Sequence, residues 1–290
     1  MTDFWDTVLT FAETTAAKVG KQLIADFGFV QASEKADGSL ITQSDKWADR
    51  EIRESIASVF PEHGILSEEG EHIFPDSEWC WIIDPLDGTT NFARGIPIWA
   101  ISLSLFYRGT PVFGYVSLPP LGQNFHGFWN EQPDAFSNSL IPQSRHLFPS
   151  AFLNHRPILA SSDAPSSNHF FSFCSRSISA IKHPFPCKIR MLGVASYNFL
   201  MVAAGWTLGG VEATPKIWDI AAVWAIVQAA GAAWVPLESE PIFPLKPGLD
   251  YSSRCFPTLV VSQPELVSVF LPLIQGVGER SQSLDNCRLG

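Results

Sequence analysis

The sequence is poor in cysteine. Its 290 residues include five cysteines, widely spaced and without a CxxC pair, a pattern that is not typical of a disulfide framework or a zinc knuckle. The stretch MTDFWDTVLTF at its start also lacks a basic region followed by an apolar run, so no signal peptide is predicted. Both absences favour reduced thiols and a cytoplasmic location.

Positive charge is scarce as well. Nineteen lysines and arginines stand against 29 aspartates and glutamates, which gives a formal net charge of −10. A nucleic-acid-binding protein needs a basic face for the phosphate backbone, so that class of partner is disfavoured. The acidic excess is compatible with cation binding and equally with an ordinary solvated surface.

No apolar run is long enough to cross a membrane. The most apolar stretch, residues 220–235, is interrupted by Gln228 and Gly231 and ends at Pro236. It falls short of the roughly 20 residues that a span requires, so we expect a buried helix and no membrane partner. The seven histidines are scattered without ligand spacing, which argues against a histidine metal site.

Helical spacing of apolar residues predicts helices over residues 4–27, 45–60, 196–205 and 218–232. Gly28 is placed to end the first helix and Ser44 to cap the second. Ser262 and Glu265 predict a capping box for a further helix, with Pro264 at its first position.

Short apolar runs bounded by turn residues predict strands over residues 64–70, 79–83, 98–107, 111–118, 158–162 and 258–262. Residues 119–150 are rich in polar residues and proline and fit loops and extended segments. Helices and strands alternate in both halves, so we expect a layered α/β fold. We place a boundary near residue 150, with 1–150 and 151–290 as two halves of one compact unit.

The stretch WIIDPLDGTTNFARG, residues 81–95, places two carboxylates three residues apart at the end of an apolar strand. Asp84 stands where open α/β sheets usually carry their sites. Asp87 begins a turn, and Gly88 allows a ligand to approach the backbone closely. Carboxylates for Mg²⁺ beside the amides of a helical turn suit phosphoryl transfer. Alternatively, Asp84 only ends a strand and Asp87 only caps a helix.

Two further acidic sites stand at similar positions. Glu68 and Glu69 come at the end of a strand, and Asp219 begins an apolar helix in the stretch WDIAA. Each has an ordinary explanation, a solvated pair in the first case and a helix cap in the second.

Taken together, Glu68-Glu69, DPLDGTTN at 84–91 and WDIAA at 218–222 resemble the inositol monophosphatase family, part of the Mg²⁺-dependent, lithium-sensitive sugar phosphatases. The order and spacing of the three blocks agree with that family. The resemblance covers nearly the whole chain and is weakest over 119–150 and 236–257.

The resemblance implies the sugar-phosphatase fold, with helix and sheet layers alternating as αβαβα, and a homodimer. It implies a phosphoric monoester hydrolase that uses activated water without a covalent intermediate. The expected substrate is inositol monophosphate or a related sugar or polyol phosphate. Fructose 1,6-bisphosphate, histidinol phosphate and a phosphoadenosine nucleotide are alternatives within the family.

The resemblance also implies a site for two to three Mg²⁺ ions. The implied ligands are Glu68, Asp84, Asp87, Asp219 and the backbone carbonyl of Leu86, with Asp84 shared between two ions. The first half of the chain would supply most of them, and the second half would supply Asp219 and the substrate contacts.

Catalytic roles follow from the same resemblance. Glu68 would act beside the metals, Thr89 would orient the attacking water and Asp45 would stand behind Thr89. The amides of Gly88 and Thr89 would hold the phosphate. Lys35 matches a family lysine near the water, although a solvated loop lysine is the alternative.

The implied substrate contacts are Asp87, Gly193, Val194, Ala195 and Glu212. Many relatives carry serine or threonine where this sequence has Val194. Valine cannot bond a hydroxyl, which disfavours inositol phosphate itself unless the nearby Ser196 compensates.

Two rival readings remain open. The string DPLDGT partly resembles the haloacid dehalogenase motif, in which an aspartate is the nucleophile. The acids of that motif lie two residues apart, whereas here they lie three apart. The other rival is a regulatory or binding homologue that kept the fold and lost turnover.

Overall fold

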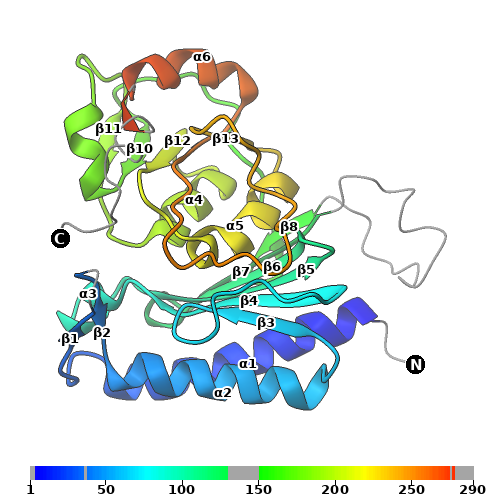
Figure 1. Ribbon diagram of the computed structural model, residues 1–290. Helices are drawn as coiled ribbons and strands as arrows, with labels where there is room; N and C mark the ends of the chain where they lie inside the picture. Colours follow the sequence, from blue (N-terminus) through cyan, green and yellow to red (C-terminus); the bar gives the residue numbers. More distant parts are fainter. Residues whose placement is uncertain (1–3, 36–37, 130–149, 275, 278–290) are drawn as a thin grey trace.

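The computed structural model describes residues 4–35, 38–129, 150–274 and 276–277. Five layers are stacked in Figure 1: two long helices, a seven-stranded sheet, two central helices, a five-stranded sheet and a short outer helix. This alternation confirms the layered α/β fold that the sequence predicts. Within the described residues, no helix combines the length and apolarity needed to cross a membrane.

The first layer consists of α1 (Phe4–Asp26) and α2 (Gln43–Val59). Both helices bury one stripe of apolar residues, which for α2 includes Ala48, Ile52 and Ile56. The expected cap at Ser44 is wrong, because the N-cap of α2 is Thr42. Its hydroxyl accepts from the Asp45 amide while Asp45 bonds the Thr42 amide in return, and this capping box leaves Ser44 inside the helix.

The seven-stranded sheet has the order β3-β4-β5-β6-β7-β8-β9, and only the β3–β4 pair is parallel. Its strands are β3 (Gly64–Ser67), β4 (Trp79–Asp87), β5 (Ala100–Tyr107), β6 (Thr110–Leu118), β7 (Gln123–Phe128), β8 (Ser150–Leu153) and β9 (Arg156–Pro157). The sequence did not resolve β7 as a strand, and residues 130–149 of the expected loop region lie outside the described residues. The boundary near residue 150 stays a prediction; β8 and β9 beyond it still belong to this sheet.

The upper layers contain α4 (Ala195–Ala203), α5 (Ile217–Ala229) and the five-stranded sheet β11-β10-β12-β14-β13. The strands of that sheet are β10 (Phe170–Phe173), β11 (Lys188–Arg190), β12 (Gly209–Glu212), β13 (Ala233–Pro236) and β14 (Thr258–Val261). The remaining short elements are β1 (Ser33–Glu34), β2 (Leu40–Ile41), α3 (Thr89–Ala93), α6 (Val267–Phe270), and the 3-10 turns η1 (Pro119–Leu121), η2 (Ser175–Ala180), η3 (Pro264–Leu266) and η4 (Leu271–Leu273).

Two local predictions fail for identifiable reasons. Residues 158–162 form no strand, because the Ile158 amide bonds Ala151 and the Ala160 amide bonds Ala230 at the end of α5. Backbone bonds to two different elements cannot form a ladder. The capping box at Ser262 is also absent, since η3 begins after Gln263 without a side-chain cap.

Helix α5 lies very close to the seven-stranded sheet. A Cβ atom added to Gly114 in β6 would stand 2.0 Å from the carbonyl oxygen of Ala222, and one added to Gly127 in β7 would stand 2.8 Å from the Cα of Ile226. The two glycines therefore let the helix backbone rest directly on the strands. This contact fixes the height of α5, and with it the position of Asp219 in its first turn.

Candidate active site

Four carboxylates from distant parts of the chain meet where β4 ends. Asp84 and Asp87 belong to β4, Glu68 follows β3, and Asp219 lies in the first turn of α5. One oxygen from each of the three aspartates lies within 4.8 Å of the others, and Glu68 is near enough for its charge to raise the pKa of Asp84. The structure thus brings together the four acids that the sequence proposed as metal ligands.

A bulge in β4 places Asp84 and Asp87 on one side of the sheet. Side chains alternate along a strand, so residues three apart normally point to opposite faces. Here Asp84 pairs with Ser102 and Asp87 with Ala100, so three steps along β4 match two along β5. The extra residue reverses the alternation. The Leu86 amide, within the bulge, donates to Asp84 Oδ1 at 3.0 Å and fixes that carboxylate.

Burial and mutual repulsion oppose the joint ionisation of these acids. Burial, followed by the charges of Glu68, Asp87 and Asp219, raises the pKa of Asp84 well above its usual range. Burial, followed by the charges of Asp87 and Glu68, also raises the pKa of Asp219 well above its usual range. A bound cation would relieve this repulsion, and hard divalent cations prefer carboxylate and carbonyl oxygens. The donor set therefore fits an ion such as Mg²⁺.

Lys35 reaches the same cluster from the β1–β2 hairpin. Its Nζ atom lies 3.0 Å from Glu68 Oε1 and also pairs with Glu69. Burial alone would lower the pKa of this ammonium group, but Glu68 and Glu69 raise it above its ordinary value. Lys35 is therefore held at the acids and is not a freely solvated loop lysine.

Thr89 and Asp45 form a connected pair beside the acids. Thr89 Oγ1 lies 2.9 Å from Asp45 Oδ1 and 3.1 Å from the carbonyl oxygen of Leu86, and its single proton can serve either acceptor. Burial raises the pKa of Asp45, although hydrogen bonds from Thr42 and Thr89 oppose that shift. Asp45 thus caps α2 and contacts Thr89 at the same time.

The segment 193–195 lies against the motif that carries Asp87. The Ser196 amide donates to Asp87 Oδ2 at 2.8 Å, so the first turn of α4 holds this carboxylate. Gly88 has a φ of 95°, and a Cβ added there would stand 2.7 Å from Val194 Cγ2. Glycine at position 88 therefore permits both the left-handed backbone and the close approach of Val194.

A cavity of about 490 Å³ opens beside these residues. Its walls include the predicted contacts Asp87, Asp219, Glu212 and the segment 193–195. Ser196 is not among its lining residues and is fully buried, so it does not replace the hydroxyl that Val194 lacks.

A comparison with protein-family models identifies the family of this chain. The model of the inositol monophosphatase family matches residues 5–267, nearly the whole sequence. The chain belongs to the inositol monophosphatase family.

Individual relatives agree with this membership. A Thermotoga maritima fructose-1,6-bisphosphatase/inositol-1-monophosphatase is 32% identical over 77% of this chain and 82% of its own length. A Rhizobium meliloti inositol-1-monophosphatase is 34% identical over 74% and 79%, respectively. The solved structure of a Thermotoga maritima IMPase matches with a TM-score of 0.76 and 26% identity, covering 95% of this chain and 99% of that one. The protein is thus a phosphatase of a metal-dependent family.

Some residues around the cavity beside Asp87 and Asp219 were not predicted from the sequence. Arg176 and Met191 line the cavity from η2 and from the segment after β11, and Asn198 lines it from α4. Asn198 lies one helical turn beyond Ala195, so helical spacing alone could have indicated it. The segment around Arg176 carries no periodic pattern that would have done so.

Glu212 gives the phosphatase a pH-dependent stability. It accepts a 2.6 Å hydrogen bond from Asn198 Nδ2, yet burial, with a further contribution from Asp87, raises its pKa to about 7. The native state therefore binds this proton more tightly than the unfolded state. The resulting stability is complete below pH 4.5, the ordinary pKa, and is lost as the pH rises to about 7.

We accordingly expect Glu212→Gln to raise the free energy of unfolding at pH 8 by roughly 2 kcal/mol in metal-free buffer, because the variant has no buried charge to form. Urea unfolding from pH 4 to pH 8 measures this effect. The exposed Glu62→Gln variant serves as the control and should follow the wild type. Identical pH profiles for Glu212→Gln and the wild type would contradict the assignment.

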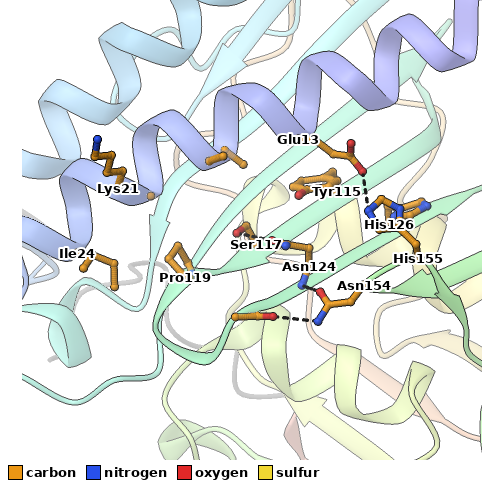
Figure 2. Close-up of a pocket in the computed structure, with 14 residues that line it drawn as sticks. Glu13, Lys21, Ile24, Tyr115, Ser117, Pro119, Asn124, His126, Asn154 and His155 are labelled. Atoms are coloured by element: carbon orange, nitrogen blue, oxygen red, sulfur yellow. Dashed lines mark hydrogen bonds and ion pairs between the residues drawn. The ribbon is translucent and has the colours of Figure 1, made fainter.

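A second cavity, of about 520 Å³, lies between α1 and the strands β6 and β7 (Figure 2). Its polar side chains pair with one another: Ser117 Oγ donates to Asn124 Oδ1 at 2.7 Å, and His155 lies 3.6 Å from Glu13. None of the four clustered acids lines it. Asp87, Glu212 and Asp219 instead line the cavity of about 490 Å³.

Proposed function

We propose that this phosphatase hydrolyses a small phosphorylated sugar or polyol with Mg²⁺, by direct attack of water. The convergence of Asp84, Asp87 and Asp219, with Glu68 beside them, is the observation that supports it most. These buried acids repel one another, and the pKa of Asp84 is raised accordingly. A site that binds divalent cations is the arrangement that such a cluster suits best.

Glu68, Asp84 and the Leu86 carbonyl would hold one ion, and Asp84, Asp87 and Asp219 a second. A third would bind more loosely near Glu68. When bound, Mg²⁺ would lower the pKa of the attacking water and neutralise charge on the leaving oxygen.

The protein's own groups would orient the water and the substrate. Thr89 Oγ1 would accept a hydrogen bond from the water while donating its proton to Asp45, 2.9 Å away. The amides of Gly88 and Thr89, at the start of α3, would bind the phosphate. Asp87 and Glu212 would accept hydrogen bonds from substrate hydroxyls, and Lys35 would keep Glu68 in place.

Thr89→Ala should lower kcat by about 100-fold with little change in KM, because the variant loses the group that orients the water. Phosphate release under saturating Mg²⁺ measures both constants. The neighbouring Thr90 is exposed, so Thr90→Ala is the matched control and should retain wild-type rates. Equal kcat values for the two variants would remove Thr89 from the mechanism.

A substrate panel tests the proposed function as a whole. It should contain inositol 1-phosphate, fructose 1,6-bisphosphate, histidinol phosphate and a phosphoadenosine nucleotide, each with and without Mg²⁺. Release of phosphate that requires Mg²⁺ supports the proposal. Failure to hydrolyse any member would favour the regulatory homologue, and an aspartyl-phosphate trapped by borohydride would favour the haloacid dehalogenase mechanism.

We also propose a cytoplasmic homodimer that lithium inhibits, in line with the family resemblance. Light scattering would test the dimer, and phosphate release with added lithium chloride would test the inhibition. A monomeric mass or an unchanged rate would contradict the respective part.

A further inference from the structure

Arg176 gives the active-site cavity a positive charge. The residue lies in η2, which follows β10, and its side chain borders the cavity. Among the described residues that line this cavity, Arg176 alone is cationic, whereas Asp87, Glu212 and Asp219 are acidic. A cation at this position changes which substrates the cavity can accept.

The guanidinium group is held in place by a neutral partner. Arg176 Nη1 donates to Thr214 Oγ1 at 2.7 Å, and Thr214, which also borders the cavity, lies two residues beyond Glu212. Over the described parts of the chain, no carboxylate comes within ion-pair distance of Arg176. A guanidinium has five N–H donors, so most of them remain available to a ligand.

Apart from Arg176 and the three acids, the side chains around the cavity are uncharged. Several lining residues are apolar, namely Ile96, Ile98, Met191, Leu192 and Val194. Met191 and Ile96 keep more than two-fifths of their surface exposed, at 45% and 44%. Such residues can contact the carbon face of a substrate but cannot offset a negative charge on it.

A substrate with two anionic groups would meet a specific difficulty here. Its first phosphate binds at the metal ligands, and any second anion would face the charges of Asp87, Glu212 and Asp219. Arginine offsets this repulsion and matches phosphate and carboxylate groups with paired donors. An arginine oriented by a hydroxyl and left without an acid is suited to that task.

We infer that Arg176 binds a second anionic group of the substrate, so that the preferred substrate carries a phosphate or carboxylate besides the phosphate that is hydrolysed. The inference rests on the proposed phosphatase function and narrows its substrate class. Arg176 is a specificity-determining residue in this assignment and takes no part in the bond cleavage.

Fructose 1,6-bisphosphate and fructose 1-phosphate provide a matched test, because they differ only in the second phosphate. Wild-type enzyme with Mg²⁺ should prefer the bisphosphate in kcat/KM by about 10- to 100-fold, the range expected for charge-assisted hydrogen bonds. Arg176→Ala should remove this preference by raising KM for the bisphosphate only. Arg176→Lys should restore part of it, since lysine keeps the charge but not the paired donors.

The exposed Arg156 in β9 supplies the control, because Arg156→Ala removes the same charge away from the cavity. A second pair of substrates, 3-phosphoglycerate and glycerol 3-phosphate, tests whether the second anionic group is a carboxylate. A preference in either pair that depends on Arg176 supports the inference and identifies the anion.

Equal kcat/KM values within both pairs, or equal losses in Arg176→Ala for both members of a pair, would overturn the inference while leaving the phosphatase function intact. Failure of the wild type on all four compounds, together with turnover of inositol 1-phosphate, would also overturn the inference alone. Failure on these four compounds and on every member of the substrate panel would instead overturn the proposed function, and the inference with it.

Discussion

Asp84→Asn is expected to abolish hydrolysis, lowering kcat/KM by at least about 1,000-fold, or about 4 kcal/mol of transition-state stabilisation. Asp84 occupies the centre of the acid cluster, with Glu68, Asp87 and Asp219 around it. In the proposed site it would help to hold both ions, so a neutral amide would weaken the binding of each. Phosphate release across the substrate panel measures the loss.

The same substitution should leave the fold intact. Ionised Asp84 is buried among like charges, so in metal-free buffer the variant should melt at the wild-type temperature or above it. Added Mg²⁺ should raise the melting temperature of the wild type, because a ligand that binds only the native state stabilises it. Asp84→Asn should show little of that increase.

The exposed Asp76 provides a matched control. Asp76→Asn should keep both the activity and the increase in melting temperature caused by Mg²⁺. Wild-type turnover by Asp84→Asn would remove this residue from the site, and an unfolded variant would show that its charge supports the fold.

Gly114→Ala is expected to destabilise the protein by about 3 kcal/mol or more, or to prevent its folding. The added Cβ would stand 2.0 Å from the carbonyl oxygen of Ala222. That oxygen belongs to the α5 backbone, which cannot rotate away as a flexible side chain would. Urea unfolding, or the yield of soluble protein where the loss is complete, measures the effect.

Gly70→Ala is the comparison for this substitution. A Cβ added there would meet its nearest neighbour at an ordinary 3.4 Å, and Gly70 has no positive φ. Its free energy of unfolding should change by about 1 kcal/mol or less. Equal stability of the two alanine variants would mean that α5 does not rest on β6 as described.

The sequence predicts most of this architecture because its patterns are local. Apolar spacing identified the two long N-terminal helices and the helices that became α4 and α5. The wrong cap of α2 comes from competition between neighbouring residues, whereas the missing strand at 158–162 comes from backbone bonds to two distant elements. Thr42 and Ser44 both carry hydroxyls suited to capping, and only Thr42 is placed to exchange bonds with Asp45.

The candidate site likewise contains residues that a local pattern predicts and residues that only the fold brings together. The bulge that turns Asp84 and Asp87 to one side lies within a recognisable motif. Asp219 lies more than a hundred residues away, and only resemblance to a family linked it to that motif. Arg176 remained undetected because its position depends on how β10 and the Thr214 loop pack, which no local pattern encodes.

The close packing of α5 on β6 and β7 affects the size of the cation that the proposed site can hold. Gly114 and Gly127 set how deeply the helix sits, and Asp219 moves with it. The distance between Asp219 and the β4 acids is thus governed from beneath the helix, by residues that never touch an ion. A larger side chain at either glycine would move Asp219 away from Asp84 and Asp87, and would change the size of cation that the proposed site accepts without altering any of the four acids.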